Sequence, residues 1–297
     1  MDELPTRDRR LQGRAYQTIA KQTWLSSVAE IVQPPVRRVA GESPAPIKNL
    51  LHGTTLGHPL HPALTDVPIG AWTASIVFDL ADAVRGSRGA RAAADLSLSV
   101  GLAGAAAAAV TGLADWSQTD GRARNVGVAH ATCNTVAAIL YGASLVLRMR
   151  GRRRSGRLTA AAGFGTVMLG GWLGGHLVFS ERAGVDHSPA EGPEKYTDVL
   201  AASELPPDTP TRVDVKGTRV LLVRTGGKVY ALAEQCPHFG GPLAEGRLEG
   251  ASIRCPWHGS RFDLASGTAR EGPTAFPARC FEVRTRAGRI QVRAARP

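Results

Sequence analysis

The chain has 297 residues, with 36 lysines and arginines against 25 aspartates and glutamates, and a net charge of +11. This length allows about two domains. The positive charge is spread along the whole chain instead of marking one basic reading face, so we expect no nucleic-acid partner; anionic membrane lipid is a sufficient partner for it. Composition changes sharply between the halves, which predicts a multidomain α + β protein: a four-helix transmembrane bundle followed by a small all-β domain.

Residues 1–57 are predicted to form an N-terminal tail with one amphipathic helix. Its apolar residues recur at helical spacing, and Arg14 and Lys21 lie beside them. Such a helix suits a membrane surface, and packing against the bundle is an equally open interpretation. The prolines at 34–35 and 44–46 predict a linker. The apolar positions are Tyr16, Ile19, Trp24, Val28, Ile31 and Val32.

Residues 58–187 are predicted to be the membrane domain. Four apolar segments, at 64–84, 96–113, 126–147 and 158–179, approach the roughly twenty residues that a spanning helix needs. A soluble all-α domain with buried helices is the alternative. Small residues in the second and fourth segments suit close helix contact in lipid. These are Gly101, Gly104, Gly170, Gly171, Gly174 and Gly175.

Polar residues gather at one end of these predicted helices. Antiparallel packing places the starts of the first and third helices and the ends of the second and fourth on one membrane face. Ionisable groups at membrane depth are costly, so their convergence predicts a site. Imidazoles there suit haem b ligation or proton acceptance from a quinol, and helix capping is the third interpretation. The residues are His58, His61, Asp66, Asp115, His130, Asn134 and His176. Asp79 and Asp82, near the other end, are expected to reach the opposite interface.

Loop charges predict a multi-pass protein of the cell membrane with the C-terminal domain on the extracytoplasmic face. Nine arginines lie near the helix ends opposite that domain, against five basic residues on its own side, and the richer face belongs in the cytoplasm. Against this, the topology exports a basic N-terminal tail that no cleavable signal peptide precedes. The run at 152–154 is either an internal twin-arginine signal or an ordinary cytoplasmic anchor.

After a linker at 188–196, residues 197–297 are predicted to form a small antiparallel β domain. Glycine-containing turns at 226–227 and 287–288 separate apolar runs. The predicted strands are 211–215, 219–224, 229–233, 281–286 and 290–293.

Two short boxes in this domain, Cys-Pro-His at 236–238 and Cys-Pro-Trp-His at 255–258, carry the chemistry. Each presents one thiolate and one imidazole from a tight turn. Two thiolates on one iron and two imidazoles on the other define a Rieske 2Fe-2S cluster, so Cys236, His238, Cys255 and His258 are the predicted ligands. Zinc accepts the same donors, but C-x-H is a poor spacing for a zinc finger.

The flanking residues resemble the Rieske family. The stretches CPHFGGPL at 236–243 and CPWHGSRFD at 255–263, followed by Gly267 and Gly272-Pro273, are similar to its two loops and its proline segment. The resemblance implies that Pro273 belongs to the segment that covers the cluster.

Two departures indicate the ferredoxin type. High-potential members carry an extra cysteine in each loop, where this chain has Gly241 and Trp257. The resemblance makes Ser260 a hydroxyl donor to a cluster sulfur, but the tyrosine of high-potential members is Phe262. Fewer hydrogen bonds to sulfur imply a low to intermediate potential. Cys280, outside both loops, is expected to be a buried small hydrophobe.

A second resemblance covers about residues 50–190. The segments HPLHPALTDVPIGAW at 58–72 and GGWLGGHLV at 170–178 are similar to bacterial four-helix membrane proteins of a family of unknown function. It implies a membrane location and no established chemistry.

Together these features predict a membrane-anchored electron-transfer protein that passes single electrons between a quinol or haem donor and a partner redox protein. The alternative is a subunit of a quinol-oxidising or oxygenase-type oxidoreductase in which the bundle is only an anchor. We do not expect a self-contained Rieske oxygenase, because the 39 residues after His258 are too few for its mononuclear-iron domain.

Overall fold

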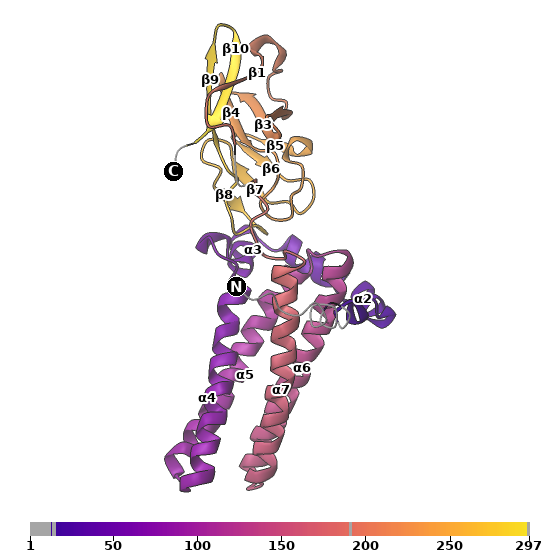
Figure 1. The fold of residues 1–297 in the computed structure, drawn as a ribbon, viewed down its shortest axis with the longest axis vertical. Helices are drawn as coiled ribbons and strands as arrows, with labels where there is room; N and C mark the ends of the chain where they lie inside the picture. Colours follow the sequence, from indigo (N-terminus) through magenta and orange to yellow (C-terminus); the bar gives the residue numbers. More distant parts are fainter. Residues whose placement is uncertain (1–12, 14–15, 190–191, 296–297) are drawn as a thin grey trace, which may run out of the picture. The chain divides into compact units, whose positions relative to one another are not determined.

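The structure, a computed structural model, describes residue 13, residues 16–189 and residues 192–295. Arg14, expected beside the amphipathic helix, lies outside them. The chain forms two compact units (Figure 1). One is helical and contains the described residues up to Glu42 together with residues 61–183. The other contains residues 184–297 and also residues 43–60, which precede the first long helix.

Four long helices make up most of the helical unit. They are α4 (Leu60–Arg85), α5 (Arg88–Trp116), α6 (Gly121–Met149) and α7 (Arg153–Phe179). All four are long and apolar enough to cross a membrane, by length and composition. The four predicted spanning segments are therefore confirmed as helices, and each begins four to eight residues before its predicted start and ends within three residues of its predicted end. Side chains such as Leu80, Ile139 and Leu158 are 63–66% exposed, as expected of a surface that faces lipid.

A small aromatic core holds the middle of the bundle together. Trp72 of α4 stacks on Tyr141 of α6 with ring centroids 4.2 Å apart. The backbone of α5 comes so close that a Cβ atom at Gly101 would lie 2.3 Å from Nε1 of Trp72. Only glycine fits there. Of the other predicted contact glycines, Gly104, Gly170 and Gly174 also meet neighbouring side chains, whereas Gly171 and Gly175 meet nothing within 4 Å.

Helix α2 (Thr23–Glu42) packs on this bundle and continues through Pro34 and Pro35, where a linker was predicted. That prediction is wrong because tertiary contacts compensate for the lost backbone hydrogen bonds. Nε2 of Gln33 donates to the carbonyl of Thr119 at 2.7 Å. The face around Leu25 is fully buried, while Trp24, Val28, Ile31 and Val32 are 37–76% exposed. One face therefore packs on the bundle and the other remains apolar and exposed.

The predicted linker at 44–46 is also wrong, because a short helix, α3 (Ala45–His52), begins there. Proline is well tolerated in the first turn of a helix, where its missing N–H has no partner to lose. The helix ends at Gly53, whose positive φ of 71° lets its N–H bond back to Asn49 and Leu50. The turn η1 (Thr54–Leu56) follows.

The β domain contains three antiparallel sheets, in the orders β1-β10-β9, β2-β3-β4 and β5-β6-β7-β8. Strand β3 alternates between two cores: Leu221 and Val223 enter one, and Val220 and Leu222 the other. All five predicted strands are confirmed to within one residue. The strands are β1 (Thr197–Ala201), β2 (Thr211–Val215), β3 (Thr218–Thr225), β4 (Lys228–Ala233), β5 (Arg247–Glu249), β6 (Ser252–Arg254), β7 (Arg261–Asp263), β8 (Ala269–Glu271), β9 (Phe281–Arg286) and β10 (Arg289–Ala294).

Candidate functional site

Two loops of the β domain have the same backbone pattern. In the loop after β4, the N–H of Cys236 donates to the carbonyl of Gly241 at 2.8 Å, and the N–H of Gly240 donates to the carbonyl of Cys236 at 2.8 Å. In the loop after β6, Cys255 makes the same two bonds with Ser260 (2.8 Å) and Gly259 (3.2 Å). Gly240 and Gly259 have positive φ angles of 76° and 78°, which glycine adopts without strain.

These loops bring the two cysteines together as one pair. Cys236 and Cys255 are 1% and 3% exposed, and their thiols share a hydrogen bond. That bond, together with burial, raises the pKa of Cys236 well above its ordinary value. The same bond lowers the pKa of Cys255 to about 7. One sulfur therefore readily becomes a thiolate, the form that binds metal.

The two histidines form a second pair. Nδ1 of His238 lies 3.3 Å from Nδ1 of His258, and their ring centroids are 4.9 Å apart with perpendicular planes. Burial lowers the pKa of His238 well below its ordinary value, and His258, His52 and His187 lower it further. A neutral imidazole is the form that ligates iron.

The arrangement in two pairs bears on which metal group the loops suit. Tetrahedral zinc needs its four donors around one ion, yet no group of three or more His, Cys, Asp or Glu side chains among the described residues is placed to hold a single ion. A Rieske 2Fe-2S cluster instead takes a thiolate pair on one iron and an imidazole pair on the other. The residues present therefore fit the cluster better than zinc.

The predicted cluster environment lies beside these loops. Ser260 is fully buried, and its Oγ accepts a hydrogen bond of 3.1 Å from the N–H of Thr274. Thr274 directly follows Pro273, which is also buried. Phe262 is fully buried in the adjoining core. Trp257, by contrast, is 57% exposed.

Three residues beside the site were missed from the sequence. His52, from α3, is 2% exposed, and the backbone N–H of His187 donates to the carbonyl of Pro237 at 2.9 Å. Nothing in the local sequence marks either of them. Glu234 is fully buried, and Nη1 of Arg219 lies 3.7 Å from its carboxyl group. A glutamate after the apolar run of β4 is a signal that could have drawn attention to it.

In the helical unit, three of the seven residues predicted for a bundle site come together. The rings of His61 and His130 are perpendicular, with centroids 6.3 Å apart. Carbonyl oxygens only accept hydrogen bonds, so Nδ1 of His61 donates to Ala108 and Nδ1 of His130 donates to Gly170, both at 2.8 Å. The amide nitrogen of Asn134 lies 3.1 Å from Nε2 of His130.

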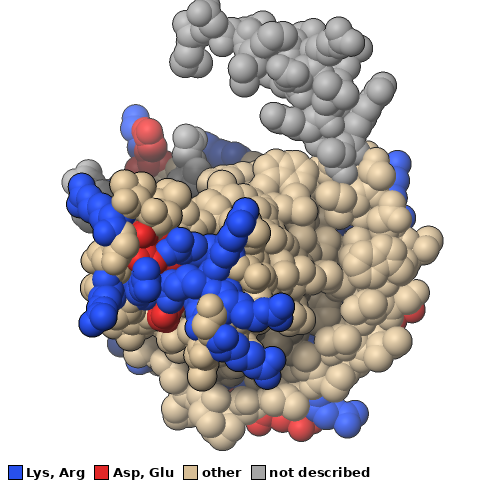
Figure 2. Space-filling view, turned by 90° about the horizontal axis from the view of Figure 1, so that it is seen from below, with Lys and Arg blue, Asp and Glu red and all other residues tan. Residues whose placement is uncertain are grey.

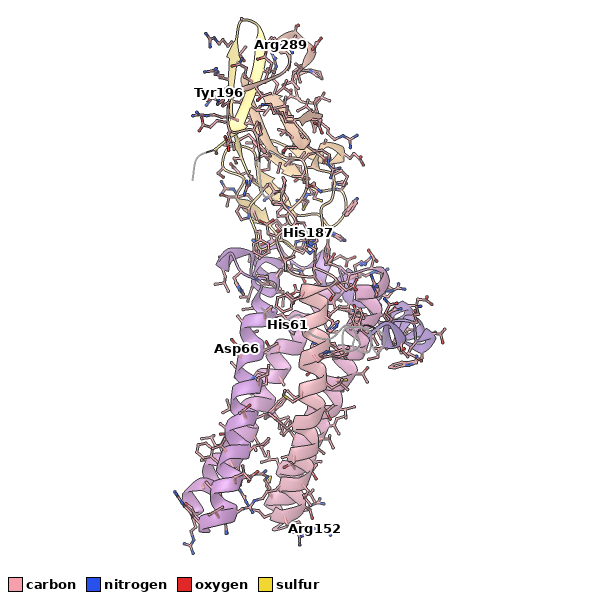
Figure 3. The ribbon with its side chains drawn as sticks, in the orientation of Figure 1. His61, Asp66, Arg152, His187, Tyr196 and Arg289 are labelled. Carbon is pink, nitrogen blue, oxygen red and sulfur yellow. The ribbon has the colours of Figure 1, made fainter. Side chains whose placement is uncertain are left out.

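The other four lie elsewhere. His176 stacks on Tyr16, with ring centroids 4.5 Å apart, and its Nδ1 donates to the carbonyl of Trp172 at 3.1 Å. Asp66 is exposed on α4 (Figure 3). Asp115 is half-buried, and His58 is exposed and belongs to the other unit.

At the other end of the bundle, Asp79 and Asp82 are buried among arginines. They are 7% and 2% exposed and form an ion-pair network with arginines of three other helices. Asp79 pairs with Arg148, and Asp82 pairs with Arg91 at 2.8 Å and with Arg157. Asp95 joins through Arg148 at 3.0 Å and Arg153 at 2.8 Å. Figure 2 shows this end, where further exposed arginines gather. These are Arg85, Arg88, Arg150, Arg152 and Arg154.

Comparison with known proteins agrees with this division of the chain. Residues 195–282 match the family described as Rieske 2Fe-2S domain, and residues 57–187 match the family described as Predicted membrane protein (DUF2231). Ferredoxin CarAc of Metapseudomonas resinovorans is 38% identical over 32% of this chain and 89% of its own length. The ferredoxin component of the naphthalene 1,2-dioxygenase system of Pseudomonas aeruginosa is 31% identical over 33% of this chain and 95% of its own length.

A human relative and a solved ferredoxin structure are also similar to this chain. Apoptosis-inducing factor 3 of Homo sapiens is 31% identical over 41% of this chain, which spans only 20% of that relative's length. The solved ferredoxin of carbazole 1,9a-dioxygenase from Nocardioides aromaticivorans IC177 is 32% identical over 34% of this chain and 100% of its own, with a TM-score of 0.33. The chain belongs to the Rieske 2Fe-2S family through its C-terminal domain, which follows a predicted membrane-protein domain of four apolar helices.

Proposed function

We propose that this protein is a membrane-anchored one-electron carrier in which Cys236, His238, Cys255 and His258 hold the 2Fe-2S cluster. The observation that carries the proposal is the pair of equivalent loops, which gather two thiols and two imidazoles separately. The cluster supplies one-electron chemistry. The protein contributes the ligands, their neutral or ionised state, and a buried environment.

The surrounding residues set how readily the cluster accepts an electron. Ser260 is fully buried and accepts a hydrogen bond from Thr274, which leaves its hydroxyl proton to donate elsewhere, and in the bound cluster it would donate to a sulfur. Hydrogen bonds to sulfur raise the potential. Phe262 cannot make such a bond, and the buried Glu234 disfavours added negative charge. These features support a low to intermediate potential.

The partner that exchanges electrons with this cluster is a redox protein, such as an oxygenase component or a reductase. One relative is named as a ferredoxin, and another is named as the ferredoxin component of a naphthalene 1,2-dioxygenase system. Trp257 is 57% exposed and directly precedes His258. Exposed tryptophan is enriched among residues that dominate binding energy at protein interfaces, which supports this loop as the docking surface.

The membrane donor is assigned to the His61–His130 pair, whose imidazoles would hold a haem b that supplies one-electron chemistry. The two rings are perpendicular, with centroids 6.3 Å apart. Both Nδ1 atoms are held by backbone carbonyls, which fixes the tautomer that offers Nε2 to a metal. The amide nitrogen of Asn134 lies 3.1 Å from Nε2 of His130 and would have to release that contact.

Electron paramagnetic resonance of the dithionite-reduced, detergent-solubilised protein tests the cluster assignment. We expect a rhombic Rieske signal in the wild type, and its loss in His238→Ala and in His258→Ala with the protein still in the membrane fraction. His187→Ala serves as the control, because His187 neighbours the loop without being a proposed ligand. A signal that survives in either ligand variant would sink the assignment.

A reduced-minus-oxidised optical spectrum tests the bundle site separately. A haem band should be present in the wild type, absent in His61→Ala and His130→Ala, and retained in His176→Ala, whose ring stacks on Tyr16 instead. A wild type with no haem band but an intact Rieske signal refutes the haem and leaves the tethered carrier. In that case ubiquinone retained by the wild type and lost in both variants would identify a quinone site.

The Rieske domain is assigned to the extracytoplasmic face. Exposed arginines gather at the end of the bundle where α7 begins, whereas the Rieske domain follows the end of α7 in the chain. Lysine and arginine in short loops favour the cytoplasm. A C-terminal alkaline phosphatase fusion that is active in whole cells supports this orientation. If the phosphatase fusion is inactive and a C-terminal green fluorescent protein fusion is fluorescent, the Rieske domain lies in the cytoplasm instead.

A further inference from the structure

Residues 43–60, named the clasp from here on, belong to the same compact unit as the β domain although they precede all four long helices. Most of the clasp lies outside both matched families, which cover residues 57–187 and 195–282. Neither family therefore assigns it a role. The clasp contacts residues 270–274, the segment that contains Pro273 and is called the proline loop below.

Three side chains of the clasp bind the proline loop. Nζ of Lys48 pairs with Glu271 at 2.7 Å, and both side chains are only 13% exposed. The amide of Asn49 makes two bonds with the backbone: it donates to the carbonyl of Arg270 at 3.2 Å and accepts from the N–H of Gly272 at 2.9 Å. The Asn49 amide thus donates to one backbone group and accepts from another, as a neighbouring β-strand would.

The buried end of the clasp is fitted closely to the loop. Oγ1 of Thr54 donates to the carbonyl of Thr274 at 2.8 Å, in a buried bond. A Cβ atom at Gly272 would lie 2.6 Å from the same Oγ1 atom, so this glycine is required by the clasp. Gly53 has a similar constraint, since its Cβ atom would lie 2.0 Å from the carbonyl oxygen of His58. The contact is a built interface with complementary shape.

The clasp reaches the cluster site by two routes. The carbonyl of Thr274 accepts a hydrogen bond from Thr54, and the N–H of Thr274 donates one to Ser260 at 3.1 Å. Thr274 therefore links the clasp to Ser260, the proposed sulfur donor. His52, one residue from the tight turn at Gly53, is 2% exposed and packs on the same loop, because its Cβ atom lies 3.7 Å from where a Cβ atom at Gly272 would be.

We propose that the clasp is a working part of the cluster site: it holds the proline loop, and through Thr274 it holds Ser260. The inference rests on the proposed function, because it requires a cluster between the two loops. Side chains that orient the groups around a metal centre change its affinity or activity about 10–100-fold when they are removed. The clasp residues are positioning residues in this sense.

The test uses the full-length protein with Thr54→Val, which keeps the shape and removes the hydroxyl, and with Asn49→Leu/Thr54→Val. Thr55→Val is the matched control, since the neighbouring Thr55 is exposed. We expect the clasp variants to lose iron to a chelator at least tenfold faster than the control. Their midpoint potential should also fall, because a loosened Ser260 bonds sulfur less well.

Combination with Ser260→Ala separates the proposed route from general loosening. If the clasp acts through Ser260, Thr54→Val lowers the potential in the wild type but adds nothing in the Ser260→Ala background. An equal shift in both backgrounds overturns this route. If the clasp variants show a normal Rieske signal, the wild-type potential and the wild-type rate of iron loss, the proposed role of the clasp is overturned. A wild type without a Rieske signal refutes the proposed function instead.

Discussion

The two ends of the helical bundle hold their buried polar groups by different means. At one end, His61 and His130 each use Nδ1 to bond a backbone carbonyl, which leaves Nε2 as the atom able to bind something else. At the other end, the carboxylates of Asp79 and Asp82 are surrounded by guanidinium groups. In the sequence both sets are ionisable residues near a helix end. The difference is that the histidines keep a ring nitrogen that can bind a further group, whereas the carboxylates have their oxygens paired with arginines.

The largest effect is expected from breaking the charged end. Arg148→Met leaves Asp79 buried without its closest partner, and removing one member of a buried pair costs about 3–5 kcal/mol. Unfolding of the purified protein in a mixed-micelle titration measures this loss. Arg152→Met, an exposed arginine at the same end, is the control. Asp79→Leu/Arg148→Met should recover most of the stability, and a double variant as unstable as the single one contradicts the pairing.

At the histidine end, Gly112→Ala should disturb the site without removing a ligand. The new Cβ atom would lie 2.7 Å from Cε1 of His61, so the ring must shift from its place. If the pair holds a haem as proposed, its retention should weaken about tenfold, as for loss of a residue that orients a ligand. The haem absorbance per protein measures it. Gly171→Ala, where the added atom meets nothing within 4 Å, is the control; equal absorbance in the two variants contradicts the paired geometry.

A buried carboxyl group in the β domain has fewer arginine partners than Asp79 and Asp82. Glu234 is fully buried, and its nearest cation, Nη1 of Arg219, is 3.7 Å away. We expect Glu234→Gln to raise the midpoint potential of the cluster, because a nearby negative charge opposes reduction. An interaction of about 1.4 kcal/mol corresponds to roughly 59 mV for a one-electron couple. Glu245→Gln, exposed and also in the loop region, is the control, and a downward shift in Glu234→Gln is the contrary result.

The smallest effect concerns a carboxylate held mainly by backbone N–H groups. Asp263 accepts bonds from the N–H groups of Ser266 and Ala265, from the Ser266 hydroxyl and from Arg270. The Ser266 N–H bond is the main reason that the pKa of Asp263 falls to about 2. Because its folded pKa lies below the ordinary value, this carboxylate stabilises the fold above about pH 4, and the stabilisation is lost as the pH falls towards 2.

Asp263→Asn should therefore lower the free energy of unfolding at pH 7 by about 1 kcal/mol, with a difference from the wild type that narrows between pH 4 and pH 2. Thermal unfolding of the full-length protein at a series of pH values measures it. A difference that stays constant over this range contradicts the assignment.

The β domain could be predicted closely because its signals are local. Strands β9 and β10 alternate around the turn at Ala287-Gly288, and the proposed ligands lie within two short Cys/His boxes. Strands β5 to β8 were missed because three residues are too few to show a period. The long helices follow from their apolar length.

What could not be predicted depends on contacts between distant residues. Nothing near Asn49 or Thr54 indicates partners more than two hundred positions later. The pairing of Asp79 with Arg148 likewise crosses from one helix to another. Prolines at 44 and 46 were read as linker residues, although their position in the first turn of α3 is compatible with a helix.

The clasp also has a consequence for how the chain is threaded through the membrane. Residues 43–60 and residues 184–297 form one unit, yet α4 to α7 lie between them in the chain. Both parts must therefore emerge on the same side, which only an even number of crossings allows. The clasp precedes α4 to α7 in the chain, and the proline loop follows them. The contact between Thr54 and Thr274 can therefore close only after all four helices have been made, and a domain inserted with the wrong parity cannot form it.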